Sequence, residues 1–189
     1  MGGTVTTPGN NLDKTGSSKN KQIYSTQIET YFTAKQKKLV RETWSKIHEH
    51  QTDMGVEIFL KLFQLKPDTK ALFPFRDLEG DTLLSDATFR SHATRFMFAI
   101  GSTVSHLDAL DVSCGTMFVL LGRKHTWIPD FPESGYLEAF TEAVAIVFED
   151  KLGKNGNREV YVAWRAVFGY IAGKMIEGYN EAKKDGHKK

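Results

Sequence analysis

The chain has little cysteine and little proline: Cys114 is its single cysteine, and five prolines are spread over 189 residues. A lone cysteine excludes an intramolecular disulfide and a zinc site built from several cysteines, which is typical of a reducing compartment. The first 22 residues hold no apolar signal segment, and no apolar run approaches the roughly 20 residues that cross a membrane. We therefore expect a soluble, cytoplasmic protein unless a lipid attaches it to a membrane.

A strong excess of one charge is also missing. The net charge is +2; residues 1–30 contribute +1 and residues 174–189 contribute +2, which leaves about −1 for the body of the chain. Nucleic-acid binding depends on clustered basic side chains that neutralise phosphates. The charge distribution therefore argues against a nucleic-acid partner.

Common catalytic motifs are absent as well. The sequence contains no glycine-rich phosphate loop, no HExxH zinc helix and no GxSxG nucleophile elbow. Ser102, Ser105 and His106 lie close together in sequence, but nothing marks either serine as an activated nucleophile. We therefore do not expect a hydrolase.

Composition divides the chain into three parts. Residues 1–30 are polar and lack sustained periodicity, which predicts a flexible N-terminal arm; residues 31–181 predict one folded domain, and residues 182–189 a basic tail. The first six residues, MGGTVT, fit the N-myristoylation pattern at Gly2. One myristoyl chain binds membranes only weakly, so the hypothesis is a peripheral membrane contact through the arm. The alternative is an arm that carries no lipid.

Apolar residues recur at helical spacing from Thr33 onward, and the β-branched runs are short and lack the alternation of strands. This pattern predicts an all-α domain of six to eight helices. Local signals mark helix ends. They are a capping box at Thr33–Gln36, a break near Pro67, an N-cap at Ser85, a helix end near His125 and a turn at 153–157.

Two of the six histidines lie on apolar helix faces. His92 shares a face with Phe89 and Phe96, and His125 shares one with Leu121. Each histidine alone is typical of a core residue that finds a hydrogen bond inside the protein. Two on different helices could instead lie on opposite sides of one flat cofactor, and such an apolar pocket suits haem. The other four histidines lie near helix ends or in the lysine-rich tail: His48, His50, His106 and His187.

Several motifs in this order resemble the globin family over about residues 33–180, and look most like its neuroglobin and globin X branch. The resemblance implies a globin fold that encloses a haem. The motifs are Trp44, the run Phe59 to Phe63 followed by Pro67, Phe73 in LFPFRD, His92, the sequence LGRKH at 121–125, and Trp164 with Phe168.

The resemblance also implies a set of iron ligands. His125 matches the proximal ligand of haem b, and the Leu121 carbonyl four residues earlier is well placed to accept a hydrogen bond from its other ring nitrogen. His92 matches the distal histidine, and in this branch both histidines often bind iron. We therefore expect a bis-histidine, six-coordinate haem whose iron His92 leaves when a gas binds.

Further residues are expected around the haem. The resemblance places Phe73 flat on the haem and Phe59 nearby, and Arg95, one turn beyond His92, could pair with a haem propionate; otherwise Arg95 is a solvated helix charge. Lys124 is a second candidate for a propionate. Phe96 stands where the family usually has a branched aliphatic residue, so the distal side should be crowded with rings, which argues against simple oxygen storage.

Three functions remain open at this point, because all three use the same two histidines. The first is reversible binding of oxygen, carbon monoxide or nitric oxide. The second is redox chemistry, such as nitric oxide or nitrite conversion with a reductase partner. The third is a membrane-tethered gas or redox sensor. We expect a monomer or weak dimer in each case.

Overall fold

The computed structural model describes residues 31–186. The predicted arm, with its lipidation motif, and residues 187–189 of the basic tail lie outside the described residues. Within the part described, seven α-helices and four short helical segments account for the secondary structure, and there is no strand. The prediction of an all-α domain with six to eight helices is therefore confirmed.

The helices follow the chain in a simple order. The α-helices are α2 (Ala34–Ile47), α3 (Gln51–Leu65), α4 (Gly80–Ser85), α5 (Ala87–Ser105), α6 (Thr116–Lys124), α7 (Tyr136–Leu152) and α8 (Arg158–Gly186). The short segments are η1 (His48–His50), η2 (Pro67–Leu72), the π-helical turn η3 (Asp111–Gly115) and η4 (Gly153–Asn155). Helix α8 runs to Gly186, so it continues past residue 182, where the basic tail was expected to begin.

The predicted capping box at the start of α2 is confirmed. The Gln36 amide donates to the Thr33 hydroxyl at 3.1 Å, and the Thr33 amide donates to the Gln36 side-chain oxygen at 2.9 Å. These two bonds satisfy amide groups that the first helical turn leaves without partners. Pro67 opens η2, as expected from a residue whose fixed φ suits a first helical position.

The predicted N-cap at Ser85 is wrong. Ser85 is the last residue of α4, where its hydroxyl donates to the carbonyl of Asp81 at 2.7 Å. The cap of α5 is the next residue, Asp86, whose carboxylate accepts from the amide of Phe89 at 2.7 Å. Because Ser85 is still part of α4 and its hydroxyl bonds to the α4 backbone, the cap of α5 falls one position later, at Asp86.

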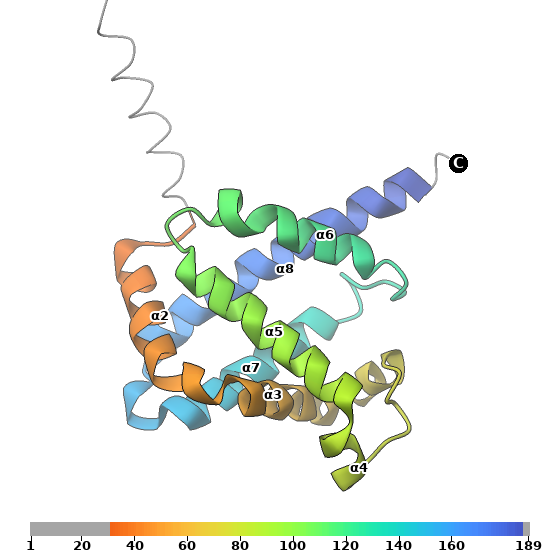
Figure 1. Cartoon of the computed structure of the whole chain (residues 1–189). Coiled ribbons are helices and arrows are strands. Elements are labelled where there is room, and N and C mark those ends of the chain that lie inside the picture. The colour runs from red at the N-terminus through yellow and green to blue at the C-terminus, as the bar shows by residue number, and fades with distance from the viewer. Residues whose placement is uncertain (1–30, 187–189) are drawn as a thin grey trace, which may run out of the picture. The chain divides into compact units, whose positions relative to one another are not determined.

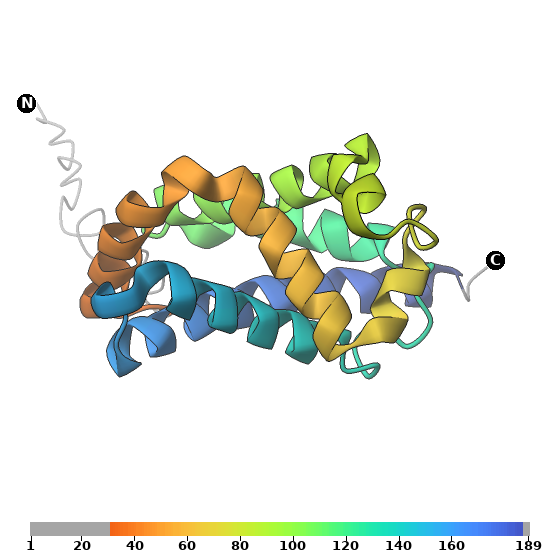
Figure 2. The same ribbon diagram turned by 90° about the horizontal axis from the view of Figure 1, so that it is seen from below.

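Helix pairs pack across one another around a shared apolar core. Helix α3 contacts α5 and α7, while α8 contacts α2 and α6. Figure 1 shows α6 lying across α8, and Figure 2, seen from below, shows α3 crossing α7. The core contains large side chains from α3, α5, α6 and α7 that are almost fully buried. Among them are Ile58, Phe89, Ile100, Phe118 and Phe148.

A glycine lets α3 and α5 approach closely near the centre of the domain. A Cβ built at Gly55 would lie 2.7 Å from the carbonyl oxygen of Ala93, the residue after His92. The backbones of the two helices are therefore in direct contact beside His92. Among the described residues, none of the helices combines the length and apolarity that would allow it to cross a membrane.

Candidate functional site

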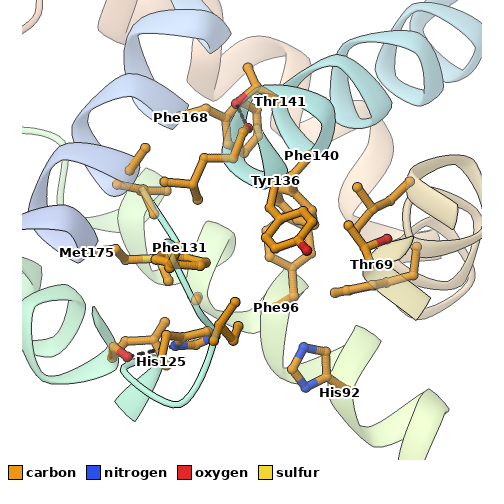
Figure 3. A pocket seen from close by; sticks show the side chains of 18 of the residues that line it. Thr69, His92, Phe96, His125, Phe131, Tyr136, Phe140, Thr141, Phe168 and Met175 are labelled. Carbon is orange, nitrogen blue, oxygen red and sulfur yellow. Dashed lines mark hydrogen bonds between the residues drawn. The ribbon is translucent and has the colours of Figure 1, made fainter. Parts of the chain in front are cut away.

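An apolar cavity of about 260 Å³ lies between α3, α5, α6, α7 and α8. Figure 3 shows side chains that line it, with His125 and His92 on two of its sides. Besides the two imidazoles, its lining is dominated by aromatic and aliphatic groups. Such a cavity favours a large, mostly apolar ligand with a small number of polar anchoring points.

His125 follows the last residue of α6 and lines the cavity. Its Nδ1 atom lies 2.8 Å from the carbonyl oxygen of Leu121, the partner that the sequence predicted. A carbonyl only accepts, so Nδ1 carries the hydrogen, and in the neutral ring Nε2 keeps its lone pair. Burial lowers the pKa of His125, although the hydrogen bond to Leu121 acts in the opposite direction. The net shift favours the neutral form of the ring, which is the form that binds a metal ion.

His92 lines the same cavity from α5 and is partly buried. Its ring makes edge contacts with Phe59 and Phe73, at centroid distances of 5.0 and 5.1 Å. Within residues 31–186, neither ring nitrogen makes a hydrogen bond. The pKa of His92 is lowered from 6.5 to about 4. Burial is the main cause, and electrostatic interactions with Arg95 and His125 add to it. At neutral pH this imidazole is uncharged and has a lone pair available.

A cluster of phenylalanine rings lies beside His92, and two of its members, Phe59 and Phe73, contact the imidazole. Phe59 packs edge-on against Phe73 at 5.9 Å and against Phe96 at 6.0 Å, and Phe96 packs edge-on against Phe140 at 4.8 Å. These contacts bring Phe59, Phe73 and Phe96 together on one side of the cavity. Edge-to-face ring pairs stabilise one another by about 0.5–1.5 kcal/mol beyond simple burial.

The two predicted basic residues lie in different places. Arg95 lines the cavity but is exposed, and it donates to the Ser91 hydroxyl at 3.0 Å. Lys124 is exposed and is not among the residues that line the cavity. The geometry therefore groups Arg95, and not Lys124, with the other predicted site residues.

Sequence reasoning missed several residues of the cavity wall. Phe140 on α7 shares a helix face with Tyr136, and that periodic pattern could have revealed it. Phe131 lies in the segment between α6 and α7, outside any periodic pattern, and its ring lies 5.2 Å from that of His125. Met175 reaches the cavity from α8. Only the packing of the helices places these side chains together.

Comparisons with known proteins agree with this architecture. The family model described as Globin matches residues 56–175, which is more than half of the chain. Neuroglobin from Danio rerio is 30% identical over 156 residues, with 82% of this chain and 95% of the relative covered. Neuroglobin from Tetraodon nigroviridis is 29% identical over 155 residues, with 81% of this chain and 96% of the relative covered.

A solved structure supports the same conclusion. The crystal structure of a hexacoordinated haem protein from an anhydrobiotic tardigrade superposes with a TM-score of 0.70 at 25% sequence identity. The match covers 79% of this chain and 96% of the tardigrade chain. The resemblance that the sequence motifs indicated is thus confirmed by the family match, the relatives and the fold, and the chain belongs to the globin family.

Proposed function

We propose that this chain is a haem-binding globin in which His125 is the permanent iron ligand and His92 an exchangeable one. The observation that supports it most directly is the pair of imidazoles that line a single apolar cavity from two helices. His125 and His92 would hold the haem iron, and the bound haem would supply reversible binding of a diatomic gas. In this proposal that gas is oxygen, carbon monoxide or nitric oxide.

The residues present fit a haem b. The ring system of haem needs a dry, aromatic surrounding, and Phe59, Phe73 and Phe140 supply one. The chain contains only Cys114, so a covalent attachment through two cysteines is excluded, and the haem would be held without a covalent bond. Arg95, at the exposed edge of the cavity, is the candidate partner for a propionate.

The two histidines differ in how firmly the protein holds them. The ring of His125 is oriented by the hydrogen bond to Leu121 and by the nearby ring of Phe131. A hydrogen bond to the second nitrogen of a ligating imidazole fixes its tautomer and increases its basicity. His92 has ring contacts but no hydrogen bond among the described residues. These contacts favour His125 as the ligand that stays and His92 as the one that leaves.

His92 has a ring-nitrogen lone pair to offer, because it lines the cavity and neither ring nitrogen has a hydrogen-bond partner among the described residues. Binding to iron would satisfy the Nε2 or Nδ1 lone pair of His92, and an incoming gas must then compete with it. An internal competitor lowers the apparent gas affinity by the fraction of time for which the position is open.

The relatives support six-coordinate iron as the resting state. The tardigrade protein is described as a hexacoordinated haem protein, and the neuroglobins match the chain over most of their length. The phenylalanine rings on the His92 side of the cavity leave little room for a bound gas, which argues against simple oxygen storage. This crowding favours a second function beside gas binding. That function is redox conversion of nitrite or nitric oxide, with electrons supplied by a reductase.

Absorption spectra of the purified full-length chain test the proposal. We expect about one haem per chain and, in the ferrous state without gas, the sharp visible bands of low-spin, six-coordinate iron. Carbon monoxide should replace these bands with those of the gas complex. A chain that binds no haem would refute the proposal entirely, and a high-spin ferrous spectrum at neutral pH would refute the role of His92.

A further inference from the structure

The helix that carries His125 is in direct backbone contact with α8. A Cβ built at Gly122 would overlap the carbonyl oxygen of Met175 and lie 2.6 Å from its carbonyl carbon. A Cβ built at Gly178 would in turn overlap the carbonyl oxygen of Val119 and lie 2.7 Å from its carbonyl carbon. Backbone atoms cannot rotate away as side chains do, so any side chain at either glycine would force the two helices apart.

The contact is reciprocal, which fixes the helices both in distance and in register. On each helix the glycine lies three residues after the carbonyl that is faced by the glycine of the other helix. These pairs are Val119 and Gly122 on α6, and Met175 and Gly178 on α8. Figure 1 shows α6 lying across α8, and these two helices are in contact. Carbon atoms in contact normally lie about 3.5–4.0 Å apart, so one added methyl group would separate the backbones by about 1 Å.

The same turn of α6 positions His125. The backbone amide of His125 donates to the Gly122 carbonyl at 3.0 Å, and its ring donates to the carbonyl of Leu121 at 2.8 Å. Both atoms that accept from His125 therefore belong to residues at or next to the glycine contact. A displacement of this turn from α8 would carry the His125 ring with it.

We propose that Gly122 and Gly178 are positioning residues for His125, and that their contact sets whether His92 and His125 can bind one iron simultaneously. The inference rests on the proposed function and adds a determinant of the coordination state. Two ligands on separate helices can hold a common atom only if both helices stay within a few tenths of an ångström of that geometry. On the α6 side, that geometry is fixed by α8.

Alanine substitutions along α8 provide matched variants. Gly178→Ala places a methyl group against Val119, whereas Gly169→Ala and Gly173→Ala place theirs in open space on the same helix. Alanine has the higher helix propensity, so the two controls should fold at least as well as the original chain. Gly122→Ala tests the other half of the contact.

The measurements are the ferrous spectrum and the rate of carbon monoxide association of haem-loaded, full-length protein. We expect Gly178→Ala and Gly122→Ala to keep their helical circular dichroism, to lose most of the low-spin bands, and to bind carbon monoxide several-fold faster; the controls should match the unsubstituted chain. A folded Gly178→Ala protein with unchanged spectrum and rate would overturn the inference. If the original chain binds haem with low-spin ferrous bands and the substituted chains show the same bands, the proposed function stands and this inference alone fails.

Hydrogen exchange on the unsubstituted haem-loaded protein covers the case in which the variants do not fold. Amides that open together exchange at similar rates. We expect the amides of residues 119–124 on α6 to be as strongly protected as those around Gly178 on α8. If the α6 amides exchange at least tenfold faster than the amides around Gly178, α6 opens without α8. That result would show that α8 does not fix His125.

Discussion

The Nδ1 atom of His125 lies 2.8 Å from the carbonyl oxygen of Leu121, one helical turn earlier. In a regular α-helix that carbonyl would accept from the His125 backbone amide. Here the amide donates instead to Gly122, three residues back, at 3.0 Å. The tighter last turn of α6 frees the Leu121 carbonyl for the imidazole, so the helix end itself orients the proposed iron ligand.

His125→Ala should abolish haem retention or weaken it strongly, because no other residue is proposed to bind the iron permanently. Haem content after gel filtration, and the spectrum, would measure this. His106→Ala is a matched control: His106 also follows a helix and has its Nδ1 atom 2.8 Å from the carbonyl four residues earlier, but it is exposed. Normal haem content in His125→Ala would contradict the assignment.

His92→Leu should convert the ferrous spectrum from sharp low-spin bands to one broad high-spin band. Leucine cannot bind iron, so the internal competitor is removed and carbon monoxide should associate faster. Stopped-flow mixing and flash photolysis measure the rate, with His48→Leu, at the exposed residue that follows α2, as a control. Identical spectra of His92→Leu and the unsubstituted chain would exclude His92 as a ligand.

Phe96→Val should speed carbon monoxide association by opening space beside His92. The substitution removes the ring that packs against Phe59 and Phe140, and truncation of this kind costs about 2 kcal/mol of unfolding free energy. Phe98→Val is the control, because Phe98 lies on the same helix with 72% of its surface exposed. If both variants bind gas at the original rate, Phe96 does not limit access to the cavity.

Asp86→Ala should lower the free energy of unfolding by about 1 kcal/mol, since it removes the carboxylate that caps α5. Ser85→Ala should change it by less than about 0.5 kcal/mol, because Ser85 is exposed and caps no helix. Urea denaturation of the haem-free chains compares the two. A larger loss for Ser85→Ala than for Asp86→Ala would contradict the observed cap.

Local signals in the sequence were enough to predict the fold class and the candidate ligands. The Thr33–Gln36 capping box involves residues three positions apart, and the Leu121–His125 pair lies within one helical turn. Such features depend on short-range geometry that the order of residues fixes. The shift of the α5 cap from Ser85 to Asp86 shows the limit, because two adjacent residues could both accept from the helix amides, and a neighbouring short helix decided between them.

Which side chains share the cavity was decided by tertiary structure alone. Phe131 and Met175 line the same cavity as His125 only because the segment before α7 and the helix α8 pack beside α6, and no periodicity in the sequence encodes this arrangement. The contact of Gly122 with the backbone of α8 is of the same kind. A glycine in a helix is ambiguous in sequence, since its role depends on which backbone lies against it. By itself, the sequence determined an all-α chain with two histidines on apolar faces; their arrangement around one cavity depends on long-range packing.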